Sequence, residues 1–167
     1  LGYEKNLNNY GYVNTEYDSL VTPLIYFGRR DITTFNNILA AQYIFNTKMS
    51  LTLRVRHYWS KAEYLDFWQL REDGGLDPSS YDGNHDLNFN AFTADLQFTW
   101  YFAPGSEINL VWKNGINTLD RDPVDNYFTN LGNMFEEPQS NSISIRVLYY
   151  LDYLVLKKAF TRKNKNA

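Results

Sequence analysis

Apolar and polar residues alternate along several stretches of this chain. In residues 49–59 the odd positions carry Met, Leu, Leu, Val, His and Trp, whereas the even positions carry Ser, Thr, Arg, Arg and Tyr. Residues 90–102 and 143–155 repeat the alternation. A period of two residues is typical of a strand with one apolar and one polar face. The pattern therefore predicts an all-β fold.

Turn and loop signals divide this pattern into six predicted strands. They cover residues 2–15, 24–45, 49–70, 87–103, 107–119 and 141–157. Three-residue breaks at 46–48 and 104–106 predict tight hairpins whose apolar faces match when Leu39 pairs with Val55 and Trp100 with Leu110. Polar segments at about 16–23, 71–86 and 120–140 predict longer loops.

Two architectures share this alternation, namely a soluble β-sandwich and an antiparallel transmembrane β-barrel. Three features favour the barrel. The strands are long enough to cross a bilayer, short turns alternate with long loops, and aromatic residues gather near strand ends, where barrels carry aromatic girdles. The predicted girdle residues are Tyr43, Phe45, Trp59, Phe98, Trp100, Phe102, Trp112, Tyr149 and Tyr153. The short turns are predicted to be periplasmic and the long loops extracellular.

The polar face of the predicted sheet would line the barrel lumen. Its charged residues are Arg54, Arg56, Asp95, Lys113, Arg146 and Asp152. Single-chain bacterial barrels have about eight strands or more, so six strands predict an incomplete barrel. We expect residues 1–158 to be the C-terminal part of a larger barrel and 159–167 to form a basic tail. A chain that begins at Leu1 is expected to be a processed or partial product.

The composition of the chain excludes several classes of function. The 167 residues include no Cys, which excludes disulfides and thiolate chemistry. A net charge of -3 argues against a nucleic-acid-binding surface, and a mean hydropathy of -0.49 against helical membrane spans. No glycine-rich cofactor signature is present, so no cofactor is predicted.

Several ordered segments carry a family resemblance. They read IYFGRRD at 25–31, KMSLTLRVRHYWS at 48–60, NFNAF at 88–92, TWYFAPGS at 99–106, LVWKN at 110–114 and LYYLDYL at 148–154. Over residues 11–158 the chain resembles the C-terminal part of large outer-membrane proteins of Bacteroidota. Those proteins carry a family-9-like carbohydrate-binding domain ahead of a barrel of uncharacterised function. The resemblance implies an outer-membrane location and a larger barrel, and it supplies no catalytic residues.

Candidate chemistry is sparse. His57 is predicted to lie at the membrane interface near Trp59. Oxygen ligands in the loop at 71–86 (Asp73, Asp77, Asp82) form a weak calcium candidate. Aromatic and apolar residues in the long loops predict local packing, a contact surface, a lid folded into the lumen, or a sugar-stacking site. These loop residues are Tyr81, Tyr127, Phe128, Met134 and Phe135.

The predicted function is that of a non-enzymatic outer-membrane barrel segment, acting in transport or as a scaffold or subunit of a larger complex. Its expected partners are outer-membrane lipid or lipopolysaccharide, and the remaining strands of its barrel or other outer-membrane proteins. Two alternatives stay open: a soluble carbohydrate-binding β-sandwich, and an outer-membrane enzyme whose site lies outside this segment.

Overall fold

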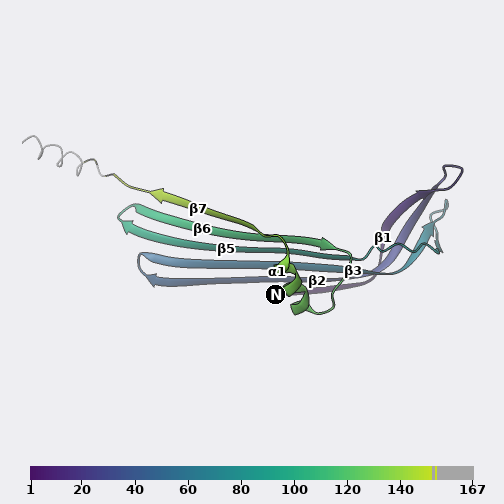
Figure 1. Ribbon diagram of the computed structural model, residues 1–167, viewed down its shortest axis with the longest axis horizontal. Coiled ribbons are helices and arrows are strands. Elements are labelled where there is room, and N and C mark those ends of the chain that lie inside the picture. The colour runs from purple at the N-terminus through teal and green to yellow at the C-terminus, as the bar shows by residue number, and fades with distance from the viewer. Residues whose placement is uncertain (152, 154–167) are drawn as a thin grey trace, which may run out of the picture. The chain divides into compact units, whose positions relative to one another are not determined.

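The strands form one antiparallel sheet that does not close on itself. The computed structural model describes residues 1–151 and 153. Within them the strand order is β1-β2-β3-β5-β6-β7 (Figure 1). The short strand β4 pairs with β3 off this path. The predicted antiparallel all-β class is therefore confirmed. Among the described residues, β1 and β7 stand at the two edges of the sheet.

The observed elements follow the predicted ones closely. Their bounds are β1 Gly2–Tyr17, β2 Pro23–Asn46, β3 Met49–Leu70, β4 Leu76–Pro78, β5 Leu87–Ala103, β6 Ser106–Asp120, α1 Tyr127–Glu136 and β7 Ser140–Leu148. β7 was predicted to reach residue 157 but ends at Leu148. Just beyond it, the Tyr150 backbone N–H donates to Ser106 Oγ at 3.0 Å instead of entering a strand ladder. The predicted basic tail 159–167 lies outside the described residues.

The β2–β3 register agrees with the predicted one. Phe35 stacks on Trp59 with ring centroids 4.9 Å apart, and Thr34 contacts Ser60. Both pairs continue the series that joins Leu39 to Val55. The alternation excludes a one-residue slip, because such a slip would set apolar against polar side chains, and the predicted length of the turn then selected this register.

The β5–β6 register differs from the predicted one by two residues. The cross-strand contacts join Asn88 with Asp120 and Asn90 with Thr118. In the predicted pairing, Asn88 would face residue 122. A shift of two residues leaves every side chain on its predicted face, so the apolar pattern cannot distinguish the two registers. Gly105, with φ +68°, provides the left-handed turn residue of this hairpin.

Two elements were not predicted. β4 has three residues, too few to show a period, and α1 lies in a segment that was predicted to be a polar loop. Asn126 caps α1, because its Oδ1 accepts hydrogen bonds from the backbone N–H groups of Phe128 and Thr129. No helix in the described part of the chain is long and apolar enough to span a membrane.

The chain divides into two compact units. The first unit comprises Leu1–Leu39, Val55–Ala94 and Asn114–Ser140, and the second comprises Ala40–Arg54, Asp95–Lys113 and the residues from Asn141 onward. Among the described residues, all buried apolar side chains belong to the first unit: Tyr26, Trp59, Ala62, Phe92, Ala94, Ile116 and Met134. The first unit therefore has a hydrophobic core, and the described part of the second unit buries no apolar side chain.

Candidate functional site

Helix α1 packs on the sheet of the first unit and covers its most buried side chains. The Tyr127 ring lies 5.8 Å from Trp59 and 5.7 Å from Phe35, and Phe135 contacts Phe92 edge-on at 5.1 Å. Trp59 is 1% exposed as a result. The region of the sheet covered by α1 is the candidate functional site, because buried polar side chains there connect the segment that contains α1 to the strands.

A chain of buried amides links α1 to β5, and Trp59 sets the direction of every bond in it. The indole N–H can only donate, and it donates to Asn88 Oδ1 at 2.7 Å. Asn88 Nδ2 therefore donates to Asn130 Oδ1 at 3.1 Å, and Asn130 Nδ2 donates to Asn90 Oδ1 at 2.6 Å. One fixed donor thus orients three asparagines, all of them buried.

The same chain fixes the tautomer of His57. Its Nε2 lies 3.2 Å from Asn90 Oδ1, which can only accept, so Nε2 carries the proton of the neutral ring. Nδ1 then accepts from the Tyr127 hydroxyl at 2.9 Å. That hydroxyl in turn accepts from Asn37 Nδ2 at 2.9 Å. His57 therefore connects α1 to the sheet, and its side chain is 4% exposed. Its predicted position at a membrane interface stays a prediction.

A polar pocket of about 350 Å³ lies on one side of α1. Amides and carboxylates dominate its walls, among them Asn88, Asn90, Asp120, Asp122, Glu136 and Glu137. Within the described residues, none of these four carboxylates forms a salt bridge. The pocket thus carries negative charge and attracts cationic groups. In the described part of the chain, no group of three His, Cys, Asp or Glu side chains is placed to hold a metal ion.

An ion pair positions the segment that leads into α1. Lys61 Nζ lies 2.6 Å from Asp125 Oδ1 and 3.0 Å from Glu63 Oε2. The Lys61 side chain is only 10% exposed, so its ammonium group requires these partners. Asp125 directly precedes the helix cap Asn126. The pair therefore ties the start of α1 to β3.

We expect Asp125→Asn to loosen the start of α1 while Lys61 keeps its contact with Glu63. The hydrogen bond from Lys61 holds the pKa of Asp125 below its ordinary value of 3.8. A carboxylate with a lowered pKa contributes stability that is complete above the ordinary value and is lost as the pH falls through the folded-state pKa. Acidification below pH 3.8 should therefore have the same effect as the substitution.

Amide hydrogen exchange of Phe128 and Thr129 measures this effect, because both N–H groups bond to the cap. Asp122→Asn is the matched control, since Asp122 forms no salt bridge among the described residues. Equal exchange rates in the two variants would contradict a tether through Lys61.

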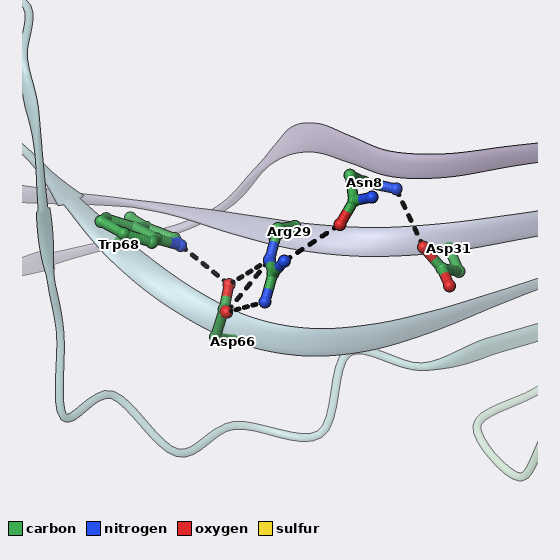
Figure 2. Close-up of polar contacts among 5 residues, drawn as sticks. All are labelled: Asn8, Arg29, Asp31, Asp66 and Trp68. Carbon is green, nitrogen blue, oxygen red and sulfur yellow. Dashed lines mark hydrogen bonds and ion pairs between the residues drawn. The ribbon is translucent and has the colours of Figure 1, made fainter.

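A second polar cluster fixes a bulge between β1 and β2 (Figure 2). The Arg29 guanidinium donates to both carboxylate oxygens of Asp66 and, at 3.0 Å, to Asn8 Oδ1. Trp68 Nε1 also donates to Asp66, and the Asn8 backbone N–H donates to Asp31 Oδ1 at 2.9 Å. Asn8 has φ +55° at a register shift of β1. Since these charges and amides satisfy one another, the cluster has a structural role.

Most predicted lumen residues lie exposed on the sheet. Lys113 Nζ is 4.0 Å from Asp95 Oδ1, and Arg146 pairs with Glu107, which the sequence analysis did not single out. Arg54 and Arg56 are exposed, and none of the salt bridges of the described residues includes them. Asp152 lies outside the described residues.

The predicted girdle divides between the two units. Tyr43, Phe45, Phe98, Trp100, Phe102, Trp112, Tyr149 and Tyr153 belong to the second unit and are exposed or half-buried. Several contact one another, such as Phe102 and Tyr149, whose rings stack 6.1 Å apart. Trp59 is the exception: it belongs to the core of the first unit. Its ring stacks on Phe35 and its N–H donates to Asn88, and its assignment to a girdle stays a prediction.

The predicted loop residues mainly pack locally. Tyr81 stacks on Tyr26 at 4.6 Å, Met134 is 1% exposed, and Tyr127 and Phe135 contact the sheet as described above. Phe128 differs, since it is 78% exposed. In the calcium candidate, Asp73 and Asp77 both bond to Arg71, at 3.0 and 3.2 Å. These two carboxylates already have a cationic partner, and Asp82 is exposed.

The amide chain of Asn88, Asn90 and Asn130 was not predicted from the sequence. A signal was present in β5, because Asn88 and Asn90 occupy the same alternating positions as Phe92 and Ala94. Polar residues at core-facing positions require a buried partner. The partner, Asn130, lies forty residues away in a segment that was predicted to be a loop, so its role was not apparent from the alternation.

The chain belongs to a protein family described as a domain of unknown function, DUF5916, whose family model matches residues 1–160. No curated protein and no solved structure is significantly similar to it.

Proposed function

We propose that this member of the DUF5916 family forms part of the wall of a transmembrane β-barrel in the outer membrane of a Gram-negative bacterium. The barrel would act in transport or as a scaffold for a larger outer-membrane complex. The resemblance to Bacteroidota outer-membrane proteins with a family-9-like carbohydrate-binding domain supports this location.

The observation that carries the proposal is the exposed apolar surface of the second unit. Its exposed large apolar side chains include Tyr43, Phe45, Trp100, Leu110, Ile143, Ile145 and Val147, with exposures of 38–71%. No apolar side chain in the described part of this unit is buried. Water-soluble proteins rarely leave such a surface uncovered, whereas hydrocarbon solvates it.

The residues that alternate with these apolar side chains along the same strands favour a water-filled lumen. Thr52, Arg54, Gln97 and Lys113 are exposed polar residues that alternate with the apolar ones. Transmembrane barrels alternate in this way between lipid and lumen. The lumen assignment of the six charged residues remains part of this proposal.

The open sheet also needs partners. β1 and β7 present unpaired strand edges within the described residues. An unpaired backbone group in hydrocarbon costs several kcal/mol, so a membrane sheet must close. Further strands of the same barrel, or another outer-membrane protein, would complete it.

Cysteine labelling on intact cells tests both the membrane location and the orientation. The chain contains no Cys, so Ser80→Cys in the long loop and Thr47→Cys in the β2–β3 turn add unique thiols. Both positions are exposed. We expect a membrane-impermeant maleimide to label Ser80→Cys on intact cells, and Thr47→Cys only after the outer membrane is permeabilised.

Equal labelling of both thiols on intact cells would contradict the orientation. A folded protein that stays soluble without detergent would instead favour the β-sandwich. Conductance of the full-length protein in planar bilayers then separates transport from scaffolding, since a scaffold with a closed lumen conducts no ions.

A further inference from the structure

A second pocket, of about 410 Å³, lies between α1 and strands β2, β3 and β5 of the first unit. Seven apolar side chains form most of its wall: Leu1, Ile38, Leu39, Val55, Phe92, Leu131 and Phe135. Ile38 and Leu39 are 54% and 61% exposed, so the pocket opens at the surface. Its size and apolar lining are typical of sites for small apolar ligands.

Almost all polar side-chain atoms at this pocket form hydrogen bonds with one another. Asn37 Nδ2 bonds to Tyr127, and Tyr127 bonds to His57, as described above. Asn37 Oδ1 is the one buried side-chain nitrogen or oxygen atom in the described residues without a hydrogen-bond partner. The pocket therefore provides little compensation for burying a charged or polyhydroxylated ligand. An apolar ligand fits these walls.

The strands that line the pocket lead directly into the apolar positions proposed to face lipid. Leu39 in β2 is followed at alternate positions by Ala41, Tyr43 and Phe45. Val55 in β3 is preceded at alternate positions by Leu53 and Leu51.

We infer that this pocket binds an acyl chain of a membrane lipid. The inference rests on the proposed function, because membrane lipid is available to this pocket only if the protein lies in a membrane. Helix α1 supplies Leu131 and Phe135 as the outer wall. The amide chain and the Tyr127–His57 bond hold that wall in place.

Site-specific photo-crosslinking tests the inference on the full-length protein, reconstituted in vesicles of phosphatidylethanolamine and phosphatidylglycerol. The photoreactive residue p-benzoylphenylalanine replaces Leu131 in the pocket, Asn133 on the polar side of the same helix, or Ile145 on the apolar surface of β7. Mass spectrometry then identifies the adducts. We expect phospholipid adducts at 131 and 145, and none at 133.

The outcomes separate the two proposals. Lipid adducts at 145 but not at 131 would overturn the pocket inference and leave the proposed function standing. Absence of adducts at 145 would contradict the proposed function itself. A protein crosslink at 131 would show that a polypeptide segment fills the pocket, which also overturns the inference. If the Leu131 variant loses the heat-modifiable band of the folded protein, the Phe135 variant replaces it.

Discussion

Replacing Asn130 with Ala is expected to weaken the attachment of helix α1 to the sheet while the strands remain folded. Asn130 is 1% exposed and bonds to both Asn88 and Asn90. Leaving buried polar groups without partners costs about 1–3 kcal/mol each. Asn88 and Asn90 keep weaker contacts with Asp120 and Thr118, which reduces the cost.

Part of this cost is offset, because alanine forms helices better than asparagine by up to about 0.7 kcal/mol. We therefore expect a net loss of about 2 kcal/mol in the free energy of opening α1, since two partners are disturbed at once. That loss corresponds to roughly 30-fold faster amide hydrogen exchange across residues 127–136. Exchange in β3 and β5 should change much less.

Asn133→Ala is the matched control, because Asn133 lies three residues later on α1 and is exposed. It should leave exchange in α1 nearly unchanged. If the two variants exchange equally fast, the amide chain does not hold the helix. The orientation that the Trp59 N–H gives to the three asparagine side chains would then not contribute to the attachment of α1.

The alternation of apolar and polar residues predicted the strands of the sheet well, because successive side chains of a β-strand point to opposite faces of the sheet. The contacts of Phe35 with Trp59 and of Thr34 with Ser60 fit the predicted β2–β3 register, in which a one-residue slip would place apolar beside polar groups. The β5–β6 register was displaced by two residues, an error that preserves every face. The β2–β3 and β5–β6 hairpins could therefore be predicted, but the second register could not.

The helix-covered site could not be predicted because its parts are far apart in sequence. Asn130 meets Asn88 and Asn90 across about forty residues, and Tyr127 meets His57 across seventy. In α1 itself, Tyr127, Leu131 and Phe135 recur every four residues, a helical signal too short to stand out in a polar segment. Trp59 and His57 were assigned to the membrane interface because alternation identifies a face but cannot show that a distant helix covers it.

Leu53→Arg is expected to impair assembly of the protein in the outer membrane. Leu53 belongs to the second unit and follows Met49 and Leu51 at alternate positions of β3. On the lipid side of a barrel, Arg near the bilayer midplane costs about 2–4 kcal/mol. A cost of this size is a large part of the stability of most proteins, so the yield of folded protein should fall strongly. Leu96→Arg, in β5, should act in the same way.

Thr52→Arg is the matched control because it places the same charge one residue away, on the polar side of the same strand. Thr52 is exposed, and Arg54 and Arg56 already occupy equivalent alternate positions. A lumen filled with water accommodates another guanidinium at little cost. Heat-modifiable migration and the amount of protein in the outer membrane measure assembly for all three variants. Equal values for the three would mean that the apolar positions do not face lipid, because a solvated surface would tolerate Arg on either side of β3.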